Sequence, residues 1–162
     1  MNRSISIAAA TLMLAACGDS GGAGEAANLA LVQGAYDAFA EGDVEGVTAV
    51  MADDIVWNEA ENFPYADGNP YVGPDAVVEG VFARLGSEWD YWRLDVEDLL
   101  ASGETVVARG RYQARHAETA AEINAQFVHF WTIEDGELAR FQQYADTAQV
   151  QAAMPDGAAG DE

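Results

Sequence analysis

Residues that could form a binding or catalytic site are concentrated near the carboxyl end of the chain. Residues 125–147 contain two runs rich in aromatic and β-branched side chains, separated by Asp135-Gly136. This dipeptide is the strongest short-range signal for a two-residue β-hairpin turn. The spacing therefore predicts a hairpin in which Glu134 lies opposite Glu137.

Pairing outwards from this turn predicts which side chains share a face of the sheet. Because strand side chains alternate between faces, one face collects both polar and aromatic groups. Its predicted pairs are Trp131 with Arg140, His129 with Gln142, Phe127 with Tyr144, and Ala125 with Asp146. A core face normally lacks arginine and aspartate, and a solvent face normally lacks large aromatic rings. The mixture indicates a face that lines a partly polar cavity, or equally a half-exposed sheet with snorkelling side chains.

Asp146, Tyr144 and His129 are the candidate catalytic residues on this face. An apolar pocket disfavours an ionised carboxylate, which would raise the basicity of Asp146 and suit it as a general base. The alternative for Asp146 is structural, because an aspartate at a strand end often accepts backbone N–H groups at a helix start. Tyr144 could polarise a carbonyl, and His129 could act as an acid, a base or a donor. For both, a place at the pocket edge or in the core is the alternative.

A second group of side chains would contact a ligand rather than react with it. Its aromatic members could form apolar walls for a ring-shaped molecule, although they could equally belong to the core. Arg140 could stabilise developing negative charge. Glu59 shares a predicted strand face with Glu61, so the two form either a carboxylate pair at the cavity rim or two solvated charges. The candidate ligand-binding residues are Trp57, Glu59, Phe127, Trp131, Arg140 and Gln142.

Several kinds of chemistry lack their sequence signals. There is no H-x-H or Cys/His cluster at metal-ligand spacing, no glycine-rich phosphate loop and no G-x-S-x-G motif. The two histidines, His116 and His129, cannot by themselves form a typical zinc site. The sequence therefore predicts chemistry without a metal or a cofactor. The formal charge of −21 also disfavours nucleic acid as a partner, because like charges repel.

The amino-terminal residues have the pattern of a signal sequence followed by a flexible tether. Residues 1–16 combine an arginine with a short apolar run that ends in small residues, which is typical of a cleaved signal. Cys17 follows Leu14-Ala15-Ala16, an arrangement similar to the lipobox of bacterial lipoproteins, in which the cysteine is lipidated. An ordinary secretory signal is the alternative. Gly18 resembles the pattern of lipoproteins sent to the outer membrane, so we expect an envelope protein anchored at its periplasmic face, with residues 17–27 as a flexible tether.

The elements that would position the candidate side chains begin with helices and end with strands. Apolar residues at helical spacing predict helices over residues 28–40, 44–51 and 76–85. Strands are predicted from residues 55–57, over 92–100 and over 105–115, followed by the hairpin. Residues 28–152 thus form one α+β domain, with helices covering one face of an antiparallel sheet. Residues 153–162 are expected to be a disordered acidic tail.

This order of elements, together with three segments, resembles the nuclear transport factor 2-like superfamily in its SnoaL-like, ketosteroid-isomerase-related branch. The segments are AYDAFAEGDVEGVTAVMADDIVW, NPYVGPDAVVEGVF and FVHFWTIEDGELARFQQYADT. The resemblance implies a cone-shaped fold, in which a curved antiparallel sheet packs against three helices around a cavity. It also implies homodimers formed through the outer face of the sheet.

The functional implication of this resemblance is broader, because a fold does not determine a reaction. The superfamily includes isomerases, polyketide cyclases, dehydratases and proteins without demonstrated catalysis. We expect a cavity for a small hydrophobic molecule, and a cofactor-free isomerase, cyclase or dehydratase that acts on a hydrophobic ring compound. A carrier or sensor that binds without turnover and a partner-binding structural lipoprotein are the alternatives.

Overall fold

The computed structural model describes residues 20–155 of the chain. The predicted signal sequence and the lipidation site at Cys17 lie outside the described residues, as do residues 156–162 of the predicted tail. Helices come first and four long strands follow, so the fold is α+β, as the sequence predicts. Within the described part of the chain, no helix is both long enough and apolar enough to cross a membrane.

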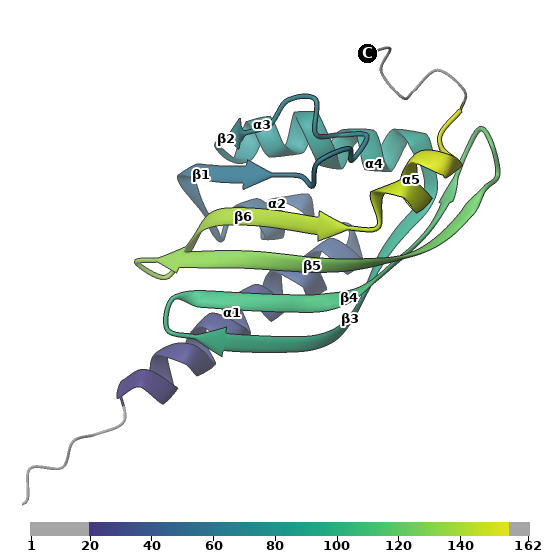
Figure 1. The fold of residues 1–162 in the computed structure, drawn as a ribbon. Helices are drawn as coiled ribbons and strands as arrows, with labels where there is room; N and C mark the ends of the chain where they lie inside the picture. The colour runs from purple at the N-terminus through teal and green to yellow at the C-terminus, as the bar shows by residue number, and fades with distance from the viewer. Residues whose placement is uncertain (1–19, 156–162) are drawn as a thin grey trace, which may run out of the picture.

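One curved sheet forms the centre of the fold (Figure 1). Its strands are β1 (Met51–Asn58), β2 (Tyr71–Val72), β3 (Trp89–Ser102), β4 (Thr105–His116), β5 (Glu122–Glu134) and β6 (Glu137–Ala145). They lie in the order β2-β1-β6-β5-β4-β3. The prediction of a fully antiparallel sheet is wrong at one place, because β1 and β6 run parallel. The hairpin with β5 sets the direction of β6, so β6 meets β1 in the orientation that this hairpin imposes.

Helices pack on one face of this sheet and at its end (Figure 1). Helix α1 (Ser20–Glu41) crosses behind the strands, and α2 (Val44–Thr48) follows it. A second helical stretch consists of α3 (Pro74–Val77), a π-helical turn (Val78–Phe82) and α4 (Ala83–Glu88). Helix α5 (Thr147–Ala153) ends the described fold and is not among the predicted helices.

Helix α1 begins at Ser20, so the prediction of a flexible tether up to residue 27 is wrong for residues 20–27. Two hydrogen bonds join this part of the helix to the turn between β3 and β4. Asn28 Nδ2 donates to the carbonyl oxygen of Gly103 at 2.9 Å, and Gly103 N–H donates to Glu25 Oε1 at 2.9 Å. These tertiary contacts stabilise a helical segment that composition alone assigns to a linker.

The β5–β6 hairpin has the predicted turn but not the predicted register. Ile133 pairs with Leu138, as expected, but Thr132 then pairs with Arg140. Ala139 is therefore an extra residue in β6, a β-bulge, and every later pair is shifted by one. Because strand side chains alternate, such a shift exchanges the two faces of β6. The residues that it moves away from the predicted cavity face are Arg140, Gln142 and Tyr144.

The core lies between the inner face of the sheet and the helices. Buried and exposed side chains alternate along β4 and β5, as expected for strands with one solvated face. The helices and the remaining strands contribute apolar side chains to the same cluster. Fully buried side chains come from seven of the elements: Val32, Ile55, Val77, Val106, Phe127, Leu138 and Val150.

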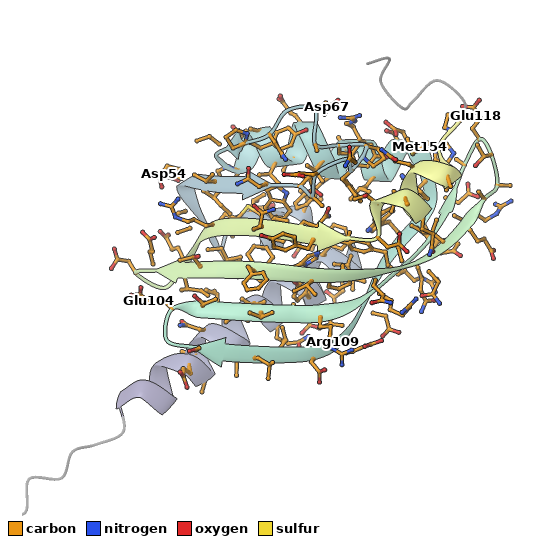
Figure 2. The ribbon with its side chains drawn as sticks, in the orientation of Figure 1. Asp54, Asp67, Glu104, Arg109, Glu118 and Met154 are labelled. Carbon is orange, nitrogen blue, oxygen red and sulfur yellow. The ribbon has the colours of Figure 1, made fainter. Side chains whose placement is uncertain are left out.

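The outer face of the sheet is largely polar. Arg109 lies on this face (Figure 2) and forms ion pairs with Glu97 and Asp98 on the neighbouring strand. Three large side chains interrupt the polar surface: Leu100, Phe130 and Tyr144 are 68%, 42% and 57% exposed, and the ring centroids of the two aromatic residues are 5.8 Å apart. The outer face is therefore mainly polar around a small apolar patch.

Asp146 caps helix α5, and this contact gives a stability prediction. Its side chain accepts a hydrogen bond from the backbone N–H of Gln149 at 3.3 Å. Asp146→Ala should lower the free energy of unfolding by about 1 kcal/mol, because the cap is lost, whereas Asp146→Asn should change it little, because asparagine caps equally well. Urea unfolding of both variants measures the effect. Equal losses in the two variants would contradict the capping role.

Candidate functional site

A cavity of about 50 Å³ lies between the inner face of the sheet and the helices. Its wall is mainly aromatic: Trp57 stacks on Phe141 with ring centroids 3.8 Å apart and meets Trp131 edge-on at 5.6 Å. Its apolar lining residues are Ala35, Phe39, Val47, Trp57, Phe63, Val81, Phe82, Leu85, Trp92, Leu94, Trp131 and Phe141. Five polar side chains complete the wall, namely Tyr36, Glu59, Tyr112, His129 and Gln143.

Glu59 places a carboxyl group inside this apolar wall. It directly follows the last residue of β1, and its side chain continues the inward alternation of Ile55 and Trp57. Trp57 Nε1 donates to Glu59 Oε1 at 2.6 Å, and the residue is only 3% exposed. Glu59 Oε2 has no hydrogen-bond partner, and it is the one buried side-chain nitrogen or oxygen of residues 20–155 in that state.

Burial changes the acidity of this carboxyl group. Removal from water disfavours the charged form and raises the pKa of Glu59 to about 7, although the hydrogen bond from Trp57 acts in the opposite direction. Such a group is partly ionised near neutral pH. It can therefore both accept and release a proton there.

Two tyrosines and a histidine form a hydrogen-bonded chain across the same cavity. Tyr36 Oη lies 2.7 Å from His129 Nδ1, and Tyr112 Oη lies 2.5 Å from His129 Nε2. At one end Trp131 Nε1 donates to Tyr36 Oη at 2.9 Å. At the other end Gln143 Nε2 donates to Tyr112 Oη at 2.9 Å. The chain thus joins α1 to strands β4, β5 and β6.

The hydrogen bonds among Tyr36, His129 and Tyr112 leave one tyrosine hydroxyl proton unused. Burial lowers the pKa of His129 to about 3, so its imidazole is neutral and carries one N–H and one lone pair. Burial also raises the pKa of Tyr36 and of Tyr112, so both hydroxyls keep their protons. The two hydrogen bonds to His129 use two of these three protons. The third belongs to whichever tyrosine accepts from the imidazole, and it is free to face a ligand.

The site therefore offers one proton acceptor and one proton donor in an apolar setting. The acceptor is Glu59 Oε2, and the donor is a hydroxyl of Tyr36 or Tyr112. Among the side chains of the described residues, no three that commonly bind metals are grouped as a metal site. The chemistry that this geometry supports is proton transfer combined with stabilisation of an oxyanion.

Five of the residues that the sequence singles out lie at or next to this cavity. Trp57, Glu59, His129 and Trp131 line it. Phe127 is buried behind the lining, where its ring stacks on His129 with centroids 4.2 Å apart. Glu59 is thus a buried cavity group instead of a rim charge, while Glu61 is exposed. Their roles with a ligand stay predictions.

The placement of Asp146, Tyr144, Arg140 and Gln142 on the cavity face is wrong. The bulge in β6 turns the last three outwards, and Gln142 donates from Nε2 to the carbonyl oxygen of Gln143 at 2.9 Å. Tyr144 is 57% exposed, and the guanidinium of Arg140 lies 3.9 Å from Glu134. Asp146 is an exposed helix cap, which is the structural alternative for this residue. None of these four side chains lines the cavity.

Sequence reasoning missed three polar residues of the cavity. Tyr36 belongs to the apolar stripe of the first predicted helix, and Tyr112 alternates with the apolar positions of a predicted strand. Both patterns place these tyrosines in the core, but neither shows that their hydroxyls meet. The predicted pairing of His129 with Gln142 puts Gln143 on the opposite face of its strand, and only the bulge at Ala139 turns Gln143 into the cavity.

Comparisons with known proteins identify relatives of this chain. The sequence matches the family model of the SnoaL-like domain over residues 32–141. An NTF2-like protein from Burkholderia thailandensis E264 is 32% identical, with a TM-score of 0.75 over 79% of this chain and 97% of that one. An NTF2-like protein of unknown function from Burkholderia pseudomallei K96243 is 27% identical, with a TM-score of 0.72 over 78% and 96% of the two chains.

A third solved structure shares the fold at lower identity. TerC, co-crystallised with polyporic acid, is 24% identical and has a TM-score of 0.71 over 78% of this chain and 97% of TerC. No curated protein matches the sequence. The resemblance stated from the sequence and the cone-shaped α+β fold are confirmed by the family model and the solved structures.

The pH dependence of stability should report the buried carboxyl group. The pKa of Glu59 is about 7 in the folded protein and near 4.5 without burial, so between these values the folded state binds the extra proton and stability falls as pH rises. Glu59→Gln removes this effect. Relative to wild type, the variant should gain about 3 kcal/mol of unfolding free energy between pH 4.5 and 7.5, measured by urea unfolding.

The comparison with wild type and one control variant separate this effect from others. His129 acts in the opposite direction, because its lowered pKa makes stability rise between about pH 3 and 6.5, but it is present in both proteins and cancels in their difference. Glu61→Gln makes the same chemical change on an exposed side chain. A gain shared by Glu61→Gln, or a difference that does not vary with pH, would contradict a raised pKa at Glu59.

Proposed function

Because this chain belongs to the SnoaL-like domain family, we propose that its cavity binds a small, mostly apolar, uncharged molecule and moves a proton on it without a cofactor. The observation that carries this proposal is the unpartnered Glu59 Oε2 in the same aromatic cavity as a free tyrosine proton. The reaction would be an isomerisation, a cyclisation or a dehydration. All three can begin when a base removes a proton from carbon next to a carbonyl.

The charges around the cavity support an uncharged ligand. No arginine is among its lining residues in the described structure, and the sequence contains no lysine. An anionic ligand would therefore meet the Glu59 carboxylate without a compensating cation. The formal charge of −21 repels anions further. A neutral carbonyl compound meets neither penalty.

The proposed mechanism assigns one step to each group. Glu59 Oε2 accepts a proton from the carbon next to the carbonyl, and negative charge develops on the carbonyl oxygen. The free hydroxyl of Tyr112 or Tyr36 donates a hydrogen bond to that oxygen, which lowers the barrier because the donor is already in place. Glu59 then returns the proton to another carbon. Ketosteroid isomerase likewise combines a carboxylate base with hydrogen-bond donors in an apolar site.

The size of the cavity limits what can enter without movement. A volume of about 50 Å³ holds only a few small atoms, so a ring compound needs the wall to open. The lining side chains Phe39, Phe82, Trp92 and Leu94 are only half-buried, and Phe39 and Phe82 meet edge-on with centroids 5.5 Å apart. These four are where a larger ligand would enter.

A carrier or sensor with the same cavity is the second candidate function. The aromatic lining supports it, because an apolar cavity can bind a ligand without turning it over. We also propose where the protein is located and how its copies assemble. The lipobox-like residues before Cys17 support anchoring at the periplasmic face of the outer membrane. The aromatic patch of Phe130 and Tyr144 supports a homodimer through the outer sheet face.

Proton exchange at carbon tests the catalytic proposal. Cyclic ketones and enones are incubated with the protein in D₂O, and loss of the proton signal next to the carbonyl is followed by NMR. Glu59→Gln should slow exchange by about 10²–10⁴-fold, because it removes the base. Asp146→Asn should exchange like wild type, because Asp146 lies outside the cavity. Ligand-induced thermal stabilisation without exchange would instead favour the carrier.

Removal of a tyrosine hydroxyl tests the donor. Tyr112→Phe should slow exchange by about 10²–10³-fold, because a preorganised oxyanion donor contributes that much. Tyr36→Phe should have a smaller effect, because Tyr112 is the hydroxyl whose pKa the nearby Glu59 carboxylate helps to raise, which places it beside the base. Steady-state rates with the two variants give the comparison. A larger loss in Tyr36→Phe would assign the free proton to Tyr36.

A further inference from the structure

The backbone of Glu59 is held by one side chain from outside the sheet. Glu59 N–H donates to Asn69 Oδ1 at 3.0 Å, and Asn69 Nδ2 donates to the carbonyl oxygen of Glu59 at 2.8 Å. A neighbouring β-strand would make the same pair of bonds. Strand β1 ends at Asn58, so Asn69 supplies to Glu59 what the sheet supplies to the residues before it.

Glu59 also lies in the wall that separates the aromatic cavity from an outer cleft. On one side is the aromatic cavity, and on the other is an outer cleft that Asn58, Glu61, Asn69 and Gln142 line. Glu59 and Gln143 line both. A rotation of the Glu59 backbone would thus be enough to carry its carboxylate from the cavity into the polar outer cleft.

The carboxylate itself is weakly held on the cavity side. Trp57 Nε1 binds Oε1, but Oε2 has no partner, and burial penalises the charged form. A solvated position in the outer cleft would remove that penalty. The backbone bonds to Asn69 therefore oppose the rotation, together with the Trp57 bond and the bond from Ala60 N–H to Gln143 Oε1 at 3.1 Å.

We propose that Asn69 is a positioning residue, which clamps the backbone of Glu59 and so keeps its carboxylate in the aromatic cavity instead of the outer cleft. Both polar atoms of the Asn69 side chain are used on Glu59, and the residue is otherwise exposed. Its own place in the loop is set by its backbone, because Asn69 N–H donates to the carbonyl oxygen of Ala66 at 3.1 Å. The inference takes its functional meaning from the proposed role of Glu59, but its test needs no substrate.

The test is the midpoint of Glu59 ionisation, followed by ¹³C NMR of carboxyl-labelled glutamate in the whole protein. The Glu59 signal is identified by its loss in Glu59→Gln. In wild type it should titrate near pH 7, and in Asn69→Ala the midpoint should fall by at least one pH unit, because the freed carboxylate reaches water. The other titratable groups that face Glu59 are Tyr36, Tyr112 and His129 in the cavity and Glu61 and Tyr144 in the outer cleft, and the variant leaves all of them in place.

Asn28→Ala is the matched control. Asn28 also donates from Nδ2 to a backbone carbonyl, at 2.9 Å, but on the turn between β3 and β4. This variant should lose a similar contact and leave the Glu59 midpoint unchanged. If Asn69→Ala does not fold, Asn69→Ser keeps a polar side chain that is too short to reach both backbone groups, and it should shift the midpoint in the same direction.

Two results would overturn the proposal. A folded Asn69→Ala or Asn69→Ser protein whose Glu59 midpoint matches wild type would reduce Asn69 to a structural loop contact. A wild-type midpoint in the ordinary range of glutamate would mean that the carboxylate is not held in the cavity. The proposed function fails separately, because wild type could show the expected midpoint and its shift and still exchange no carbon-bound proton.

Discussion

A buried chain of hydrogen-bonded side chains is the constraint on which the rest of the structure depends. Its members, in order, are Trp131, Tyr36, His129, Tyr112 and Gln143. Buried polar groups cost free energy unless each finds a partner. These five find partners only when α1, β4, β5 and β6 are in register with one another. The bonds that hold the helix on the sheet therefore also shape the cavity.

Burial acts on the two ionisable groups of this cavity in opposite directions. It raises the pKa of Glu59 to about 7 and lowers that of His129 to about 3, because each loses the water that stabilises its charged form. At neutral pH the histidine is a fixed, neutral connector, and the carboxyl group is the one that titrates. Burial therefore makes His129 a neutral hydrogen-bonding group and leaves Glu59 as the group that can exchange a proton near neutral pH.

The carboxyl group of Asp67, which forms an ion pair with Arg84, has its pKa shifted in the direction opposite to that of Glu59. Asp67 lies on an exposed loop near α3 and α4 (Figure 2), and Arg84 Nη1 donates to both of its carboxylate oxygens, at 2.7 and 2.9 Å. Although partial burial acts to raise the pKa of Asp67, the hydrogen bond and charge of Arg84 lower it. No arginine lines the cavity beside Glu59 in the part of the chain that the structure describes. A carboxylate left without a cation in an apolar wall is the feature on which the proposed proton transfer depends.

The sequence by itself determined the class of the fold and the inward face of β5. Helical spacing identified the main helices, and the Asp135-Gly136 turn placed the hairpin. Alternation then put His129 and Trp131 inside, because a strand buried on one face must alternate. These features follow from local chemistry, which the chain carries wherever it folds.

Only the tertiary structure decided which side chains meet. One extra residue, Ala139, reversed the faces of β6 and replaced Tyr144 with Gln143 in the cavity, and no local pattern marks that bulge. Glu59 resembles any solvated glutamate until the sheet and the loop of Asn69 enclose it. Burial and long-range hydrogen bonds are properties of the packed whole. A site that depends on them is therefore found only in the folded structure and not in the local sequence.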